Sequence, residues 1–200
     1  MKIILIGASG TIGKGILAVL SPTHEIIKVG HSGGDFRVDL SAKPSIEKLF
    51  QDVGSFDAVI CAAGMAKFGS LDEQPDEDYQ LAVSNKLMGQ VNLVRVGRRY
   101  INDNGSFTLT SGMLSYHPIP GSASISMVNA GLEGFVRAAA LELQRGIRVN
   151  AVSPVFVKET MEAMGMDSAD GMKAVKVALA YKESVEGKRH GEILDVMDFA

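Results

Sequence analysis

The sequence predicts an α/β fold: a mostly parallel, doubly wound sheet covered by helices in three layers. Short apolar runs with the length of buried strands alternate with segments whose apolar residues recur at helical spacing. A glycine-rich turn at residues 7–13 joins the first apolar run, residues 3–6, to the first helical segment. No internal repeat or linker interrupts the 200 residues, so residues 1–200 are expected to form one domain.

The elements follow in order along the chain. Ser41 or Ser45 is expected to cap the second helix, and Asn104 with Gly105 is expected to form a turn before the fifth strand. We interpret residues 156–171 as a loop or short helix that forms a lid over the substrate. The expected strands are 3–6, 25–29, 36–38, 58–62, 106–111, 148–152 and 192–196, and the expected helices lie at 12–20, around 46–50, 76–100, around 132–141 and 172–182.

Composition excludes several classes of function. With 20 Lys and Arg against 23 Asp and Glu, the net charge is −3, and no basic run favours nucleic acid. No apolar stretch approaches the roughly 20 residues needed to cross a bilayer. Cys61 is the sole cysteine, which rules out an internal disulfide and favours a cytoplasmic protein. Cys61 lies within an apolar run, so we expect a buried structural thiol rather than a nucleophile.

The glycine turn favours a phosphate-containing ligand. Its spacing is Gly-x-x-Gly-x-x-Gly, set by Gly7, Gly10 and Gly13. Glycines allow a sharp turn and the close approach of a pyrophosphate, and the N–H groups at the start of the following helix face the negative charge. An ordinary tight turn is the alternative, but the strand before it and the helix after it favour a phosphate cradle.

Six stretches in one order resemble the short-chain dehydrogenase/reductase family over nearly the whole chain. They are residues 7–13, 39–40, 61–64, 110–112, 131–137 and 148–154. The resemblance implies a Rossmann-type fold with a seven-stranded sheet and a nicotinamide cofactor. It also implies hydride transfer between that cofactor and a carbonyl or alcohol, and a homodimer or homotetramer.

The resemblance further implies which residues bind the cofactor. Those expected around the pyrophosphate and adenosine ribose are Gly7, Ser9, Gly10, Thr11, Ile12 and Gly13. Those expected at the adenine ring and central ribose are Asp39, Leu40, Ala62, Ala63 and Gly64, with Pro154 and Val157 near the nicotinamide. For Asp39 a turn or cap role stays open, and for Pro154 the simple termination of a strand.

The end of the second strand favours NADP over NAD. An acidic residue there would hold the ribose 2′-hydroxyl and repel a 2′-phosphate, but His31 and Ser32 occupy this loop. Both can donate hydrogen bonds to a phosphate, and Arg37 follows. Asp35 keeps NAD open as the less favoured cofactor.

The reaction centre departs from the family pattern. Ser111 fits the family's serine, but Ile125 stands where its tyrosine acid/base is expected and Asn129 where its lysine is expected. Neither side chain titrates near neutral pH, so the chain resembles a divergent member without the Tyr-x-x-x-Lys pair. Lys86 occupies the position of the family's helical asparagine, although a shift of one residue would put Asn85 there.

Ser111, Lys86 and Asn129 are therefore the candidate catalytic residues, with Tyr116 and His117 as alternative relocated acids. The expected function is an NADP(H)-dependent oxidoreductase of a small carbonyl or alcohol. An NADP(H)-binding sensor that has lost catalysis is the alternative, and a structural subunit that keeps the cofactor for stability is a weaker one. The lid residues Phe156, Met161, Met164 and Met166 suggest an apolar substrate pocket.

Overall fold

A computed structural model describes residues 1–199 and contains one seven-stranded sheet in which every described pairing is parallel. The strands lie in the order β3-β2-β1-β4-β5-β6-β7. Their bounds are β1 Lys2–Ile6, β2 Glu25–Gly30, β3 Phe36–Arg37, β4 Phe56–Cys61, β5 Ile101–Thr110, β6 Arg148–Ser153 and β7 Ile193–Asp195. The predicted α/β, Rossmann-type architecture is confirmed.

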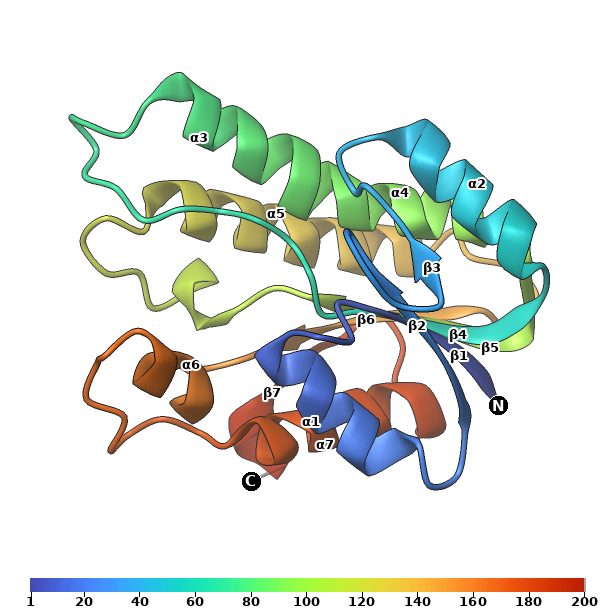
Figure 1. Cartoon of the computed structure of the whole chain (residues 1–200). Coiled ribbons are helices and arrows are strands. Elements are labelled where there is room, and N and C mark those ends of the chain that lie inside the picture. Colours follow the sequence, from blue (N-terminus) through green and yellow to red (C-terminus); the bar gives the residue numbers. More distant parts are fainter. Residues whose placement is uncertain (200) are drawn as a thin grey trace.

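Helices cover both faces of the sheet in three layers (Figure 1). Helices α2, α3, α4 and α5 lie over one face, and α1 and α7 lie under the other. The helix bounds are α1 Thr11–Leu20, α2 Lys43–Val53, α3 Asp76–Leu81, α4 Met88–Gly97, α5 Ala123–Ala140, α6 Lys158–Ala163 and α7 Ala174–Glu186. A π-helical segment, Ala82–Leu87, joins α3 to α4, and short 3₁₀ turns lie at Met113–Ser115 and Val196–Phe199. Among residues 1–199, no helix has the length and apolar character needed to cross a membrane.

Two apolar cores, one on each face, hold the sheet. Phe50 of α2 stacks on Phe56 of β4 with ring centroids 5.2 Å apart, within the core that α2, α4 and α5 close. Ile16 of α1 and Val177 of α7 belong to the opposite core. The central strands are buried on both faces, as expected of a parallel sheet, and Cys61 at the end of β4 is a buried free thiol as predicted.

Two local expectations were wrong. The turn predicted at Asn104 and Gly105 lies inside β5, where Asn104 adopts a φ of 62° and the pairing register with β4 shifts, so the break is a bulge within one strand. Neither Ser41 nor Ser45 caps α2, which begins after Ala42 without a side-chain cap. The helical region predicted over about 76–100 is confirmed from Asp76 to Gly97, and it contains the π-helical segment.

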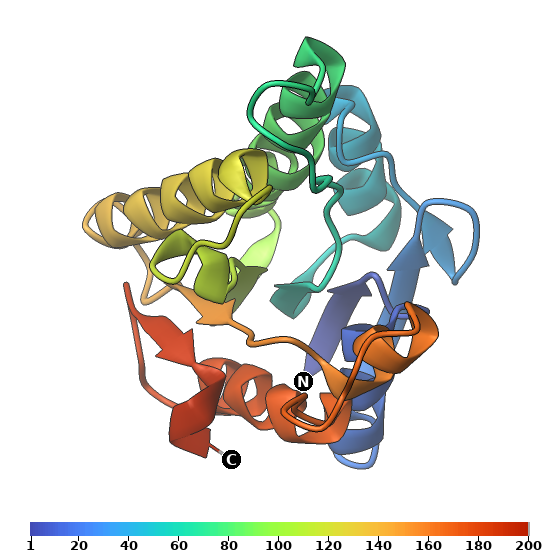
Figure 2. The same cartoon turned by 90° about the vertical axis from the view of Figure 1, so that its left-hand side faces the viewer.

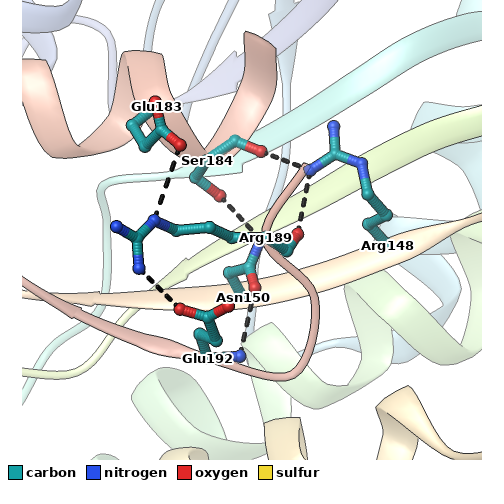
Figure 3. Close-up of polar contacts among 6 residues, drawn as sticks. All are labelled: Arg148, Asn150, Glu183, Ser184, Arg189 and Glu192. Carbon is teal, nitrogen blue, oxygen red and sulfur yellow. Dashed lines mark hydrogen bonds and ion pairs between the residues drawn. The ribbon is translucent and has the colours of Figure 1, made fainter. Parts of the chain in front are cut away.

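The edge strand β7 is fastened by polar contacts that local sequence patterns do not reveal (Figure 3). The Arg148 guanidinium donates to the carbonyl oxygens of Ser184 (2.7 Å) and Arg189 (3.1 Å). Asn150 Nδ2 donates to the carbonyl of Arg189 at 2.9 Å, and its Oδ1 accepts from the Glu192 N–H at 3.1 Å. These bonds tie the end of α7 and the loop before β7 to β6.

The carboxyl ends of the strands open toward three long connections. These are the loop after β4, the loop after β5 and the segment after β6 that contains α6. Figure 2 shows all three on the side that faces the viewer, around the ends of the central strands. Strand order reverses between β1 and β4, and ligands of open α/β sheets bind in the crevice outside such a reversal. The fold therefore places any functional site on this side.

Candidate functional site

The glycine turn has the backbone geometry that a phosphate-binding turn requires. Gly7 has a φ of +86°, and a Cβ there would lie 2.6 Å from the carbonyl oxygen of Ala62, so a side chain has no room. A Cβ at Gly13 would collide with the carbonyl oxygen of Gly7. Because glycine has no Cβ, α1 can pack tightly on the turn. Helix α1 begins after Gly10 with no side-chain cap and no acidic residue in its first turn. Its first N–H groups are thus available to an anion.

A cavity of about 320 Å³, here called the turn cavity, lies beside this cradle. It brings together six residues predicted for the adenosine half of a dinucleotide: Gly7, Ser9, His31, Leu40, Ala63 and Gly64. Leu40 and Val38 supply apolar wall on which a planar ring can lie. The predicted residues Gly10, Thr11, Gly13 and Ala62 shape the cradle rather than line this cavity.

The loop after β2 leaves room for an added phosphate. A cavity of about 360 Å³, here called the loop cavity, is lined by Ser9, Lys28 and Ser32 among others. Asp35, the residue that kept NAD open, accepts a hydrogen bond from the Lys28 N–H at 2.8 Å and lines neither cavity. Asp39 accepts from the Ser41 N–H at 2.9 Å, so its carboxylate forms a turn beside the cavity wall.

The π-helical segment decides between Asn85 and Lys86. Asn85 lines the turn cavity, where its Oδ1 accepts from the Met65 N–H at 2.9 Å and its Nδ2 donates to Ser41 Oγ at 2.9 Å. Lys86 lines a separate cavity. A Cβ at Gly64 would lie 2.9 Å from Cγ of Lys86, so the glycine leaves space for the lysine stem. Such π-helical turns recur at functional sites.

The cavity that contains Lys86, here called the lysine cavity, has a volume of about 270 Å³. It gathers residues from the glycine turn, the ends of β5 and β6, the loop after β4, α5 and α6. Its lining residues are Ile12, Phe68, Lys86, Thr110, Ser111, Gly112, Met113, Leu114, Ile125, Asn129, Pro154, Val155, Phe156, Val157 and Thr160. All three candidate catalytic residues and the predicted Ile12, Pro154 and Val157 thus meet in one place.

Lys86 is the sole titratable side chain among these described lining residues. Its Nζ donates to the carbonyl oxygen of Ser111 at 3.3 Å, and no carboxylate among residues 1–199 lies within 4.0 Å of it. Burial lowers the pKa of Lys86 to about 8. This amine therefore changes protonation state within a working pH range.

Ser111 and Asn129 each donate a hydrogen bond to a backbone carbonyl near the carboxyl end of a central strand. Ser111 Oγ donates to the Val152 carbonyl at 3.4 Å, and Asn129 Nδ2 donates to the Gly112 carbonyl at 3.3 Å. Asn129 Oδ1 is buried with no protein partner among the described residues. A buried acceptor without a partner is uncommon, so a hydroxyl group of a bound ligand would satisfy it.

Several side chains expected near the reaction centre lie apart from the lysine cavity. The Tyr116 hydroxyl donates to the Asp195 carboxylate at 2.8 Å, and its partial burial, with that carboxylate beside it, raises the pKa of Tyr116. His117 packs on the Tyr116 ring, and neither residue lines the lysine cavity, so their positions favour Lys86 over either as the acid. Of the apolar lid residues, Phe156 lines the cavity, whereas Met164 and Met166 are 63% and 45% exposed.

Sequence reasoning missed several cavity residues. Phe68 of the loop after β4 and Thr160 of α6 both line the lysine cavity, and Met65 lines the turn cavity. An apolar residue in a loop after a buried strand was the available signal for Phe68, because such loops surround the crevice. Nothing local identified Thr160, which reaches the cavity through the packing of α6.

The residues present fit a nicotinamide dinucleotide. The side-chain-free cradle at Gly7 and Gly13 suits a pyrophosphate, and it lies between the turn cavity and the lysine cavity. Asn129 Oδ1 offers an unpaired acceptor on the lysine-cavity side. Among the described residues, no group of three His, Cys, Asp or Glu side chains is placed to hold a metal ion.

Comparison with known proteins gives a family match over most of the chain. A family model described as enoyl-(acyl carrier protein) reductase matches residues 21–196. Hydroxynaphthalene reductase arp2 of Aspergillus fumigatus is 30% identical over 76% of this chain and 60% of its own length. The 3-oxoacyl-[acyl-carrier-protein] reductase FabG of Thermotoga maritima is 30% identical over 60% of this chain and 50% of its own length. The chain thus spans about half to three fifths of these two relatives.

Solved structures match the chain over nearly its full length. The crystal structure of the protein lin1944 from Listeria innocua has a TM-score of 0.94 and 41% identity, and the match covers 98% of this chain and 99% of that one. A small-chain dehydrogenase in complex with NADPH has a TM-score of 0.86 and 27% identity, and the match covers 98% of this chain and 95% of that one.

Proposed function

This chain belongs to the short-chain dehydrogenase/reductase family of oxidoreductases, and we propose that it is an NADP(H)-dependent reductase of a small carbonyl compound whose proton donor is Lys86. The observation that carries the proposal is the lysine cavity, in which one titratable amine lies with Ser111 and Asn129. The cavity adjoins a cradle suited to a dinucleotide.

The cofactor assignment rests on the cradle and on the loop after β2. Gly7 and Gly13 leave the pyrophosphate space, and the uncapped start of α1 faces its charge. His31 and Ser32 flank the turn and loop cavities, where no acidic side chain lines the wall among the described residues. The NADPH complex of a relative that is 27% identical supports NADP over NAD.

When bound, NADPH supplies the hydride, and the protein supplies position and a proton. The walls of the lysine cavity at Ile12, Ile125 and Phe156 are apolar, so cofactor and substrate together would displace water from around the reacting groups. Asn129 Oδ1, a buried acceptor without a protein partner among the described residues, would accept from a ribose hydroxyl of the bound cofactor and so help to hold it in place. Lys86 Nζ donates a proton to the carbonyl oxygen as it is reduced, and Ser111 Oγ donates a hydrogen bond to the same oxygen.

The ammonium group of Lys86 suits the role of proton donor. An ammonium with a pKa near 8 remains mostly protonated at neutral pH, yet releases its proton more readily than an exposed lysine. In this proposal Lys86 takes the part of the missing family tyrosine, and Asn129 takes part of the role of the missing lysine. Ile125 then contributes only apolar surface.

A catalytically weakened NADP(H) sensor is the second candidate. The observation that favours it is Ile125 on the wall of the lysine cavity, at the position that the resemblance assigns to the family's tyrosine. An intact cofactor cradle beside an apolar wall would bind the dinucleotide and leave the carbonyl without its usual acid.

Two measurements separate the candidates. NADPH fluorescence titration tests binding, and absence of saturable binding at tens of micromolar would exclude both. NADPH oxidation with a panel of small ketones, aldehydes and thioesters then tests turnover. Turnover that Lys86→Gln lowers and Lys48→Gln leaves intact supports the reductase, because Lys48 is an exposed lysine of α2 that pairs with Asp52 and does not line the lysine cavity. Tight binding without turnover supports the sensor.

We further propose a cytoplasmic homodimer or homotetramer. The proposal follows the family resemblance and the free, buried Cys61, whose pKa burial raises to about 12. Light scattering after size exclusion measures the mass, and a monomer at working concentration would reject the assembly.

A further inference from the structure

The entrance to the lysine cavity is formed by three segments at the carboxyl ends of the strands. These are residues 65–80 after β4, 111–122 after β5 and 156–173 after β6, and we call them together the mouth. Each contributes to the cavity wall, through Phe68, Leu114 and Phe156 respectively. The first two segments are also joined, since the Gly69 N–H donates to the carbonyl of Gly121 at 3.0 Å. Figure 2 shows all three around the strand ends.

The mouth is strongly acidic. Residues 65–80 contain five carboxylates and one lysine, so their net charge is −4. Residues 156–173 contain four carboxylates and two lysines, so their net charge is −2. Residues 111–122 contain no Asp, Glu, Lys or Arg. The mouth therefore carries −6, whereas the whole chain carries −3, so the rest of the chain has a net charge of +3.

Most of these carboxylates face solvent. The exposed ones are Asp72, Glu73, Asp76, Glu77, Glu159, Glu162, Asp167 and Asp170. One mouth carboxylate is paired with a cation: Asp78 contacts Lys67 Nζ at 2.7 Å. Net charge of one sign around a cleft produces a field that steers approaching ligands.

The lysine cavity behind the mouth is not acidic. Its walls are mainly apolar, and its one ionisable group is the amine of Lys86. A volume of about 270 Å³ accommodates a small organic molecule rather than a carrier arm together with its carrier. An anionic group attached to the substrate would have to remain at the mouth, against the −6 rim.

We infer that the mouth selects free, uncharged carbonyl substrates and disfavours acyl groups delivered on an anionic carrier such as coenzyme A or an acidic carrier protein. The inference deepens the proposed reductase function and rests on it. It also separates this chain from the 28–30% identical relatives whose names specify an acyl carrier protein. Like charges set against each other lower the association rate and penalise the wrong partner.

The test compares two thioesters of one acyl group. Acetoacetyl-N-acetylcysteamine is uncharged, whereas acetoacetyl-coenzyme A carries roughly four negative charges from its phosphates. At about 0.01 M ionic strength, where the Debye length is about 30 Å, we expect kcat/KM to be at least about tenfold higher for the uncharged thioester. At about 0.5 M salt the ratio should fall severalfold, because screening removes most of the repulsion.

Charge-reversal variants locate the effect. Asp72→Lys/Asp170→Lys changes the mouth by four charges at two exposed carboxylates and should lower the ratio at low salt. The matched control, Glu25→Lys/Glu142→Lys, makes the same change at exposed positions at the start of β2 and beyond the end of α5, at the opposite end of the sheet. The control should leave the ratio unchanged.

A second readout does not require turnover. Calorimetric titration of the NADP⁺-saturated protein with each thioester should show the same preference in affinity. Equal or better use of the coenzyme A ester overturns the inference, and so does a preference that neither salt nor the mouth variant changes. If no carbonyl is turned over while the uncharged thioester still binds more tightly, the reductase function fails and the charge selection stands.

Discussion

Replacement of Lys86 by glutamine is the most direct test of the proposed chemistry. The change keeps a polar side chain in place of the amine, whose Nζ lies 3.3 Å from the Ser111 carbonyl oxygen, but removes the proton that titrates. Loss of a positioned general acid costs about 10²–10⁴ in rate, so we expect kcat/KM for reduction at pH 7 to fall at least about 100-fold. Saturable NADPH binding should persist, because Lys86 forms part of neither the glycine turn nor the turn cavity.

The pH profile gives the sharper signature. Reduction requires protonated Lys86, and burial lowers its pKa to about 8, so activity is full well below that pH and is lost above it. The protonated fraction falls from roughly 91% at pH 7 to roughly 9% at pH 9, a decline in kcat/KM of about tenfold. An ordinary exposed lysine, with a pKa of about 10.4, would produce almost no decline over this range.

Stopped-flow or steady-state NADPH oxidation between pH 6 and pH 10 measures both effects. The alkaline limb should be present in the wild type and in Lys48→Gln, and absent from the residual activity of Lys86→Gln. A Lys86→Gln variant with wild-type rate and an unchanged limb would refute the assignment of the proton donor.

Three further outcomes test the site. Gly7→Ala places a side chain at a φ of +86° and a Cβ 2.6 Å from the carbonyl oxygen of Ala62. We expect the free energy of unfolding, measured by denaturant titration, to fall by about 1–3 kcal/mol, and NADPH fluorescence titration to show no measurable binding. His31→Ala should weaken NADPH several-fold and leave NADH affinity unchanged, and an equal loss for both would remove the argument for NADP. Tyr116→Phe deletes the hydroxyl that donates to Asp195 outside the lysine cavity, so kcat should change less than about twofold, and a large loss would restore Tyr116 as an acid.

The architecture could be predicted from the sequence because the patterns that indicate it involve neighbouring residues. A buried parallel strand reads as an apolar run, and the turn at Gly7 and Gly13 must lack side chains wherever it packs against a neighbouring strand. The same locality explains an error, since Asn104 and Gly105 have the composition of a turn but form a bulge within β5, between the residues Ile101 and Ser106 that pair with β4.

The candidate site could be predicted from the sequence only in part. Ser111, Asn129 and Pro154 follow or face strand ends, so the strand pattern alone brought them near one crevice. Tyr116 occupies a loop whose direction is set by a partner on β7, 79 positions along the chain. No pattern within the loop carries that information.

By itself, the sequence determined the layered sheet, the glycine turn between β1 and α1 and the absence of a titrating group at Ile125 and Asn129, because each depends on residue type and near neighbours. The tertiary structure alone decided that Lys86 and not Asn85 enters the lysine cavity. Consecutive helical residues point about 100° apart, and a π-helical turn shifts the phase, so a single register difference exchanges the two side chains between cavities. That phase is fixed by packing against residues such as Gly64, which lie elsewhere in the sequence.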